Sequence, residues 1–276
     1  MIWTALPSAS APGAWQSSVR KQRVVDLLKS IETGDVRAVT AINPNKYVQH
    51  NLAAADGLAG FGELMKQLPP GSAKVNTRRV LEDGNFVVAH TEYNFFGPKI
   101  GFDIFRFEGD QIVEHWDNLQ TTAPPNRANR TMIDGPSEVT DLNRTAANKT
   151  LVRNFVDDFF INRRPEKIDQ YFDGEKYMQH NPGLGDGNGL FRTPRVAGAP
   201  AILTFERVHA VLGEGNFVLT IAEGTFRGQP SSFYDLYRIE NGKIAEHWDT
   251  IETIPARSEW KNPNGKFGFP TSAAAK

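Results

Sequence analysis

The sequence predicts an α+β protein built from two tandem copies of one small domain. Three strings of residues recur in the same order, at offsets of 130 to 132 residues. Repetition at a nearly constant spacing is the mark of duplicated structural units. The 276 residues also suffice for two domains of about 100 to 150 residues each. The recurring strings are KYVQHN (46–51) and KYMQHN (176–181), GNFV (84–87 and 215–218), and EHWD (114–117 and 246–249).

Each copy is expected to open with an amphipathic helix. Apolar residues fall at helical spacing over 24–31 in the first copy and over 152–160 in the second. In the first copy, Ser17 or Ser18 is a suitable N-cap and Gly34 a suitable terminator.

A further helix is predicted after the first His-Asn pair, over residues 58–68. Asp56 is its N-cap candidate, and two prolines stop it. Its counterpart in the second copy, around 187–198, is interrupted by Pro194 and by glycines, so we expect it to be short or irregular.

After the helices, both copies change to apolar runs of period two that are joined by tight turns. This pattern predicts a meander of antiparallel strands with the helices covering one face of the sheet. The turns are expected at 83–84, 109–110, 214–215 and 241–242. The predicted organisation is a tail (1–18), a first domain (19–122), an exposed linker (123–140), a second domain (141–256) and a C-terminal tail (257–276).

Composition excludes several classes of function. The 31 basic and 32 acidic residues nearly cancel, and no basic tract is present, so neither nucleic acid nor a membrane surface is expected as a partner. Cysteine is absent, which removes disulfides and thiolate sites. No stretch approaches the roughly 18 apolar residues of a membrane helix, so a soluble protein is expected. A cytoplasmic location is predicted, with the alternative of an exported protein whose signal peptide has been removed.

Several motifs together resemble the SnoaL-like branch of the nuclear transport factor 2-like superfamily. The pattern is Tyr-x-Gln-His-Asn, then Asp-Gly, then Asp-x-(Phe/Tyr)-Arg, a turn, and Ile-x-Glu-His-Trp-Asp. The first copy supplies it at 47–51, 56–57, 103–106 and 112–117, and the second at 177–182, 186–187, 235–238 and 244–249. The matching segments span nearly the whole chain outside its termini and linker.

The resemblance implies a cone-shaped fold in each copy, in which a highly curved antiparallel or mixed sheet wraps around N-terminal helices and encloses an apolar cavity. It does not imply one reaction, because polyketide cyclases, isomerases, dehydratases, epoxide hydrolases and non-catalytic binders share this fold. In SnoaL-like cyclases the acid–base residue is a strand carboxylate that faces the cavity. By motif this position is Asp117, with Asp103 as its partner.

The register of one hairpin decides which of these side chains meet. A two-residue turn at 109–110 pairs Asp103 with Trp116 and directs His115 and Asp117 to the opposite face. A three-residue turn with a bulge pairs Asp103 with Asp117 and aligns His115 beside them. The sequence leaves both alternatives open.

Cofactor-free acid–base chemistry needs a carboxylate or imidazole in apolar surroundings and a donor for the developing oxyanion. His90 has no counterpart, since Ile221 takes its place, and this favours the first copy as the catalytic one. The catalytic candidates are Asp103, Asp117, His115, His90 and His50. The ligand-binding candidates are Tyr47, Trp116, Glu92, His180, Asp235, His247, Trp248 and Asp249.

Structural roles are open for the same residues. The aspartates could form salt bridges, the two tryptophans could be core residues, and His50 and His180 could cap the following loop. A metal site from His50, His90, His115 and Asp103 is conceivable by residue type, but no close His-x-His or His-Glu-x-x-His pair supports it. Neither a metal nor an organic cofactor is therefore predicted.

Two functions follow from these residues. The first is a cofactor-independent lyase, isomerase or cyclase that acts on a small hydrophobic carbonyl compound. The second is a non-catalytic protein that binds a small apolar metabolite. We also expect the two copies to pack sheet to sheet as an intrachain pseudo-dimer, because an isolated curved sheet leaves an apolar face exposed, and a further homodimer stays open.

Overall fold

The computed structural model describes residues 18–69, 71–192 and 201–273. The predicted N-terminal tail therefore lies outside the described residues except for Ser18, as does the Pro194 interruption. No helix within the described ranges is both long and apolar enough to cross a membrane.

Each half of the chain forms a five-stranded mixed sheet with its own helices, which confirms the predicted α+β class and the tandem arrangement. The first half contains α1 (Val19–Thr33), β1 (Val48–Gln49), α2 (Gly57–Gln67), β2 (Lys74–Asp83), β3 (Phe86–Asn94), β4 (Pro98–Glu108) and β5 (Gln111–Thr121). The second half contains α3 (Thr145–Val156), α4 (Ile168–Tyr171), β6 (Met178–Gln179), α5 (Gly189–Arg192), β7 (Leu203–Glu214), β8 (Phe217–Phe226), β9 (Gln229–Glu240) and β10 (Lys243–Thr253). We call these halves the first and second repeats.

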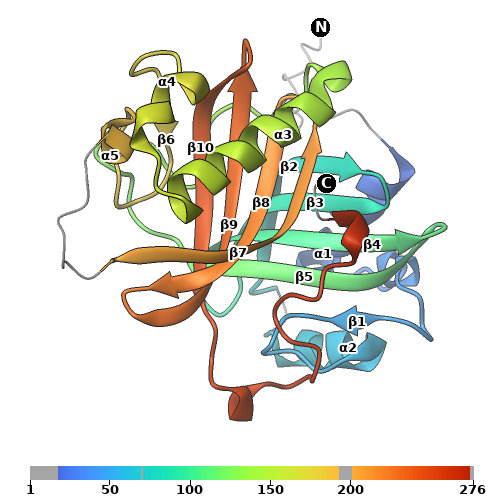
Figure 1. Cartoon of the computed structure of the whole chain (residues 1–276). Helices are drawn as coiled ribbons and strands as arrows, with labels where there is room; N and C mark the ends of the chain where they lie inside the picture. The colour runs from blue at the N-terminus through green and yellow to red at the C-terminus, as the bar shows by residue number, and fades with distance from the viewer. Residues whose placement is uncertain (1–17, 70, 193–200, 274–276) are drawn as a thin grey trace, which may run out of the picture.

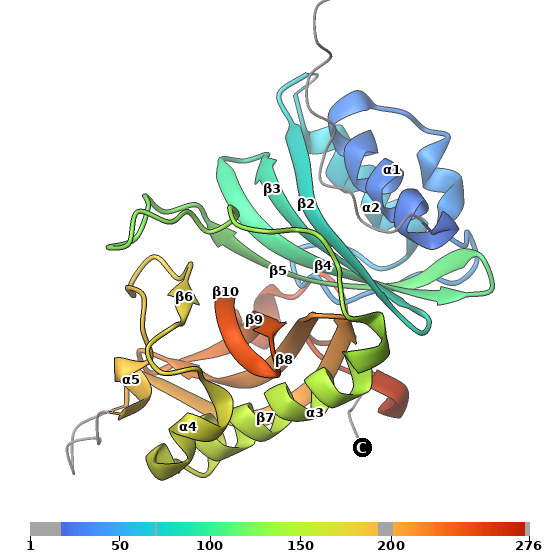
Figure 2. The same ribbon diagram turned by 90° about the horizontal axis from the view of Figure 1, so that it is seen from above.

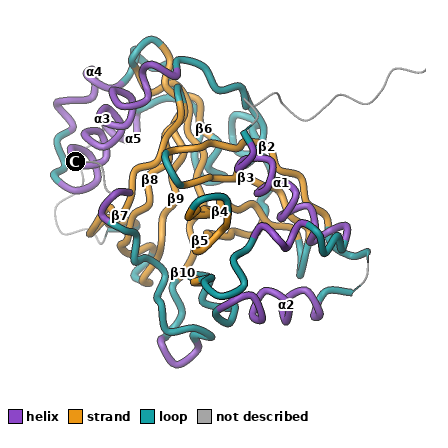
Figure 3. Tube along the Cα trace, turned by 90° about the vertical axis from the view of Figure 1, so that its right-hand side faces the viewer, coloured by secondary structure: helices purple, strands orange, loops and turns teal. Residues whose placement is uncertain are grey.

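The two sheets have the same topology. The strand order is β1-β5-β4-β3-β2 in the first and β6-β10-β9-β8-β7 in the second. The short first strand of each sheet pairs in parallel with the last, and the four long strands form the predicted antiparallel meander. The sheets lie face to face with their strands crossing, and the helices cover the two outer sides (Figures 1 and 2). Figure 3 shows the same layers from the side.

Local sequence signals account for the helix ends. Ser18 caps α1 by accepting a hydrogen bond from the backbone N–H of Lys21 at 3.0 Å, and Gly34 ends this helix at a φ of 71°. Asp56 occupies the N-cap position of α2, but its carboxylate accepts the backbone N–H of Gln49 instead. The counterpart of α2 is α5, which is described over Gly189–Arg192; residues 193–200, on which the predicted interruption falls, lie outside the described part of the chain.

Two predicted turns are displaced by one residue, because Asp83 and Glu214 are the last residues of their strands. They pair with Phe86 and Phe217, so the turns consist of residues 84–85 and 215–216. The turns at 109–110 and 241–242 lie where they were predicted.

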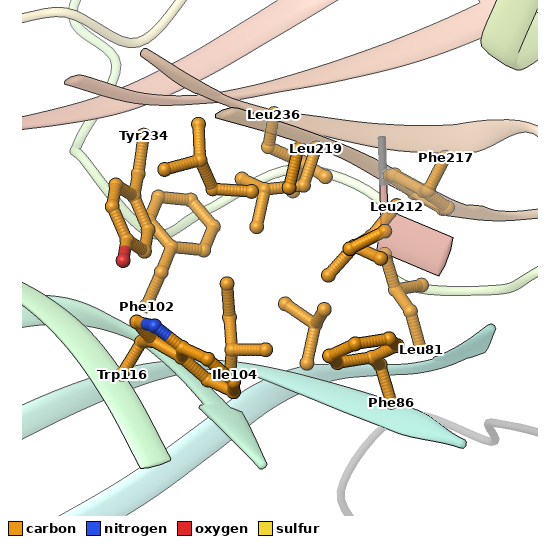
Figure 4. Packing of buried hydrophobic residues seen from close by; sticks show 14 of the residues in the cluster. Leu81, Phe86, Phe102, Ile104, Trp116, Leu212, Phe217, Leu219, Tyr234 and Leu236 are labelled. Atoms are coloured by element: carbon orange, nitrogen blue, oxygen red, sulfur yellow. The ribbon is translucent and has the colours of Figure 1, made fainter. Parts of the chain in front are cut away.

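A large apolar cluster lies between the two sheets. Phe102, Ile104 and Trp116 of the first repeat face Leu219, Tyr234 and Leu236 of the second, and all are buried (Figure 4). Near this cluster, Asn118 Nδ2 donates to the carbonyl oxygen of Thr250 at 2.8 Å. Each sheet therefore covers the apolar face of the other.

Each repeat is followed by a segment that contacts the other repeat. We call residues 123–140 the linker arm and residues 257–273 the C-terminal arm. The linker arm meets the second repeat, where the carbonyl oxygens of Thr131 and Asp134 lie 2.7 Å from His180 Nδ1 and 2.9 Å from Trp248 Nε1. The linker is not the exposed connector that the sequence predicted, because Asn126 and Met132 are buried.

The C-terminal arm makes the matching contacts with the first repeat. The carbonyl oxygen of Gly265 lies 2.7 Å from His50 Nδ1, and that of Phe267 accepts Trp116 Nε1–H at 2.9 Å. The linker arm therefore contacts His180 and Trp248 of the second repeat. The C-terminal arm contacts the equivalent side chains, His50 and Trp116, of the first repeat.

Candidate functional site

A β-bulge sets the register of the β4–β5 hairpin. Glu108 pairs with Gln111 across a two-residue turn, but Arg106 pairs with Glu114, which leaves Val113 as an extra residue. Asp103 therefore pairs with Asp117, and His115 lies on the same face as Asp117. This is the second of the two predicted registers, although the extra residue lies in the strand and not in the turn. The second repeat has the same shift at Ala245, which pairs Asp235 with Asp249.

The first repeat brings three of the predicted catalytic residues together in a buried polar cluster. His115 Nε2 lies 3.1 Å from Asp103 Oδ1, and Asn51 Nδ2 donates to Asp117 Oδ2 at 2.5 Å. Asp103, His115 and Asp117 expose only 5, 8 and 3 % of their surfaces. The predicted ligand residue Tyr47 is also buried, and the charges of both aspartates add to burial in raising its pKa.

Gln49 fixes the position of one proton on His115. Its Oε1 atom accepts the backbone N–H of Asn51 at 2.9 Å, which identifies it as the carbonyl oxygen of the amide. The same oxygen lies 2.9 Å from His115 Nδ1, so Nδ1 carries a hydrogen and donates it. A contact between Nε2 and Asp103 then requires one more proton. The pair therefore shares this proton, as imidazolium–carboxylate or as imidazole–carboxylic acid.

Two further donors complete the first cluster. The Tyr93 hydroxyl donates to Asp103 Oδ2 at 2.6 Å. Lys266, on the C-terminal arm, lies with its Nζ 3.4 Å from Asp117 Oδ1 and 2.6 Å from Glu252 Oε2. Burial alone would lower the pKa of Lys266, but the two carboxylates outweigh it, so the pKa is raised. Burial raises the pKa of Asp103, and the hydrogen bond and charge of His115 oppose this effect.

The second repeat contains the same His–Asp pair. Gln179 Oε1 accepts the backbone N–H of Asn181 at 3.0 Å and lies 2.8 Å from His247 Nδ1, while His247 Nε2 lies 3.0 Å from Asp235 Oδ1. The same reasoning gives one shared proton. Asn181 Nδ2 donates to Asp249 Oδ2 at 2.6 Å, and burial, partly offset by the charge of His247, raises the pKa of Asp249 to about 6.

The donors of the first cluster have no equivalent in the second. The position of Tyr93 is taken by Gly224, since these two residues pair with Val75 and Phe205 at matching points of their sheets. Among the described residues, Asp235 Oδ2 and Asp249 Oδ1 are buried and have no hydrogen-bond partner. The second cluster thus presents free acceptors where the first is filled.

Four predicted site residues of the first repeat lie away from this cluster. Trp116 belongs to the core between the sheets, since neighbouring residues of a strand point to opposite faces. His90 and Glu92 alternate with Tyr93 on β3 and point away from the cluster in the same way; His90 stacks on Phe102, and Glu92 is exposed. His50 stacks on Trp116 and lies 3.0 Å from Glu114. These placements correct the prediction that all four residues line one cavity with Asp117.

The second repeat shows the same division. Asp235, His247 and Asp249 form the polar cluster, whereas Trp248 lies in the core between the sheets and His180 stacks on it. Burial and the charge of Arg79, which lies 3.1 Å from His90, hold the pKa of His90 well below its usual value. His90 is a neutral interface residue and not the feature that distinguishes the first repeat as a site.

Among the described residues, Asp103, His115 and Asp117 form the group that could hold a metal ion, with ligand atoms within 4.8 Å of one another. The ammonium of Lys266 beside Asp117 disfavours a cation there. The four residues considered from sequence, His50, His90, His115 and Asp103, do not converge, because the first two lie on the other face of the sheet.

Two surface clefts lie apart from the first cluster. The larger, of about 930 Å³, belongs to the second repeat and is lined by Phe172, Tyr177 and Asp186 among others. The smaller, of about 380 Å³, lies beside α1 and includes Arg23 and Gln111. Neither cleft is lined by Asp103, His115 or Asp117 of the first cluster, nor by Asp235, His247 or Asp249 of the second.

Sequence reasoning missed Lys266 and Gln49 as members of the first cluster. Lys266 lies in a segment that was read as a tail, and no local pattern marks it. Gln49 stands within the recurring KYVQHN string, and its repetition as Gln179 was an available signal. Tyr93 was likewise not among the site residues predicted from the sequence.

No family model and no curated protein matches this sequence. The chain is similar to NTF2-like proteins of known structure. These include IdmH of Streptomyces antibioticus, a proposed polyketide cyclase, at 13 % identity and a TM-score of 0.32, over 36 % of this chain and 90 % of that one. An NTF2-like protein of unknown function from Cytophaga hutchinsonii matches at 16 % identity and a TM-score of 0.32, over 38 and 92 % of the two chains. An LEH-like epoxide hydrolase of M. tuberculosis matches at 15 % identity and a TM-score of 0.32, over 37 % of this chain and 83 % of that one.

Proposed function

We propose that the first repeat carries out cofactor-independent acid–base chemistry of lyase, isomerase or cyclase type on a small apolar carbonyl compound. The observation that supports this most directly is the shared proton of the Asp103–His115 pair, which Gln49 orients. Such a pair can take up or release a proton, and burial raises the pKa of Asp103.

Enolate chemistry needs a base and a donor in the same place. In the first repeat, Asp117 supplies a carboxylate, while Tyr93 and Lys266 supply a hydroxyl and an ammonium. We assign Asp117 as the group that accepts the α-proton of the substrate, and Lys266, through its third N–H, as the donor to the carbonyl oxygen. The Asp103–His115 pair, which Tyr93 holds through Asp103, is the store that returns a proton. Tyr47 would form part of the wall.

Deuterium exchange tests this proposal without knowledge of the natural substrate. A panel of small apolar ketones is incubated with the full chain in D₂O, and loss of the α-proton signal is followed by NMR. We expect acceleration for at least one ketone, a loss of about 100-fold in rate for Asp117→Asn, in the range for a general base, and no change for the matched Asp249→Asn. Equal rates for the wild type and Asp117→Asn would overturn the assignment.

The alternative, a binding protein without turnover, is favoured for the second repeat. That repeat has the same His–Asp pair but lacks the tyrosine and lysine donors, so it offers acceptors and little to stabilise an oxyanion. Saturable binding without proton exchange would be its signature.

A further inference from the structure

A row of three polar residues crosses the second sheet. Thr220 on β8 pairs with Asp235 on β9, which pairs with Asp249 on β10. Paired residues of adjacent strands point to the same face, with Cβ atoms about 4.5 to 5.5 Å apart. The three side chains therefore lie side by side on the face toward α3, together with Val218 and Phe233 of the second apolar cluster.

Each member of this row keeps one oxygen without a partner. Within the described part of the chain, Thr220 Oγ1, Asp235 Oδ2 and Asp249 Oδ1 are buried and accept or donate no hydrogen bond. The side chains are more than nine-tenths buried, with Thr220 at 0 %, Asp235 at 6 % and Asp249 at 7 % exposure. Buried polar atoms are nearly always paired in native proteins, so three free oxygens in one row indicate a place that a ligand completes.

The first repeat shows which groups satisfy these carboxylates. The equivalent row there is Ala89, Asp103 and Asp117. A phenol from Tyr93 and an ammonium from Lys266 donate to its two carboxylates. In the second repeat the residue equivalent to Tyr93 is Gly224.

The linker arm supplies no ammonium either. Lys266 lies between Gly265 and Phe267, whose carbonyl oxygens contact the His and Trp of the first repeat. Between the equivalent contacts at Thr131 and Asp134, the linker arm carries Met132 and Ile133.

Charge points to a cation. The Asp235–His247 pair with its shared proton is neutral as a pair, so Asp249, when ionised, leaves the row with one negative charge. A primary ammonium carries one positive charge and three N–H donors, which matches three free acceptors. We propose that the second repeat binds a small primary ammonium compound with an apolar body, whose nitrogen donates to Thr220 Oγ1, Asp235 Oδ2 and Asp249 Oδ1.

Aromatic rings lie next to His247, the partner of Asp235, and suit an apolar body. The rings of Tyr237 and Tyr177 lie 4.9 and 6.3 Å from that of His247. Tyr177 and Phe172 belong to the second apolar cluster and also line the cleft of about 930 Å³. Burial, and after it the charges of Asp235 and Asp249, raise the pKa of Tyr177, so this cleft-lining ring lies near both carboxylates. Thr220, Asp235 and Asp249 do not line this cleft, so the proposal places the bound ammonium deeper than the cleft, on the inner side of these rings. A cation beside the rings gains further attraction.

Calorimetric titration of the full chain near pH 7.5 tests the proposal with three probes of similar size. Benzylamine has the charge and the three donors, benzyltrimethylammonium has the charge alone, and benzyl alcohol has neither. We expect saturable binding of one benzylamine per chain, with both other probes at least tenfold weaker. The proposal is overturned if benzyl alcohol binds as tightly as benzylamine, or if benzylamine shows no saturable binding.

Three variants locate the bound probe. Asp249→Asn should weaken benzylamine binding at least tenfold, and Thr220→Val, which removes one acceptor at nearly constant volume, should weaken it several-fold. Asp117→Asn, the matched change in the first repeat, should leave the affinity for benzylamine unchanged. Circular dichroism checks folding, and if Asp249→Asn does not fold, Thr220→Val decides. Wild-type affinity in a folded Asp249→Asn or Thr220→Val would place the probe elsewhere and contradict the proposal.

Discussion

The two carboxylate clusters have the same strand register and the same His–Asp pair, yet they differ in how their oxygens are satisfied. In the first repeat Tyr93 and Lys266 donate to Asp103 and Asp117, whereas in the second repeat no donor among the described residues reaches one oxygen of each equivalent aspartate. The difference comes from residues outside the recurring strings. The duplicated strands thus retain one proton-sharing pair, and its surroundings decide what it can do.

The linker arm and the C-terminal arm are one source of this difference. Both arms fix the His and Trp of the opposite repeat through backbone carbonyls, and these contacts use no side chain of the residues between them. The residues between these fixed points are therefore free to differ, and only the C-terminal arm places a lysine there. An arm that follows one repeat can in this way set the charge of the other repeat.

The largest effect is expected for removal of Lys266. Lys266→Met would leave Glu252 and Asp117 as buried carboxylates without their cation, and loss of one partner from a buried ion pair typically costs about 3 to 5 kcal/mol. Urea denaturation gives the free energy of unfolding. Lys261→Met on the same arm is the control, because the Lys261 side chain is exposed and should change stability by less than about 0.5 kcal/mol. Equal losses in the two variants would show that Lys266 acts only through its position on the arm.

The next largest effect is a gain in the free energy of unfolding, and it is expected for removal of the Asp249 carboxylate. The pKa of Asp249 is raised from 3.8 to about 6, so ionisation of Asp249 destabilises the folded state, and this cost grows as pH rises from about 4 through about 6. Asp249→Asn should therefore stabilise the protein by about 3 kcal/mol near pH 7.5, since each pKa unit corresponds to about 1.4 kcal/mol. Near pH 4 the gain should vanish.

Urea denaturation at both pH values checks this expectation. The matched control is Asp117→Asn, because Lys266 faces the Asp117 carboxylate, whereas Asp235, His247 and Asn181 surround Asp249. That matched variant should lose stability at pH 7.5. A loss for Asp249→Asn of the same size would mean that the two aspartates have equivalent surroundings.

The sequence predicted the repeat, the sheet-and-helix layout and the His–Asp candidates, because all of these follow from local periodicity and from recurrence. It could not decide the register, since neither Val113 nor Ala245 differs from an ordinary strand residue, and a bulge at either one moves every later side chain to the other face. Side chains alternate along β5, so Trp116 could not share the face of Asp117, and the prediction of Trp116 as a ligand-binding residue beside Asp117 overlooked this.

Long-range contacts account for the rest. Lys266 lies 149 residues from Asp117 in sequence, and His50 meets Gly265 across 215 residues. No pattern within a short window can report such contacts. The role of His90 was misjudged for a related reason, because its absence from the second repeat looked like a functional difference, whereas the side chain packs on Phe102 away from the polar cluster.

A smaller effect should make the first repeat resemble the second. Tyr93→Phe removes the hydroxyl that donates to Asp103 Oδ2 and leaves that oxygen unpaired, as Asp235 Oδ2 is now. A buried acceptor without its donor costs about 1 to 3 kcal/mol. The loss would appear as a lower urea midpoint with an unchanged slope. A stability equal to that of the wild type would indicate that another donor reaches Asp103, and the contrast between the repeats would then rest on Lys266 alone.

The smallest effect concerns the arms themselves. Asn262 Nδ2 donates to the carbonyls of Asn51 and Ala54, and Asn126 Nδ2 donates to those of Gln179 and Asn181. Each substitution to alanine should cost about 1 kcal/mol in the free energy of unfolding. Because the two asparagines contact different repeats, their effects should add in the double variant to within about 0.5 kcal/mol if the arms act independently. A double variant that loses clearly more or less than the sum would show that the arms are coupled through the shared core, and the charge set by one arm could then respond to the position of the other.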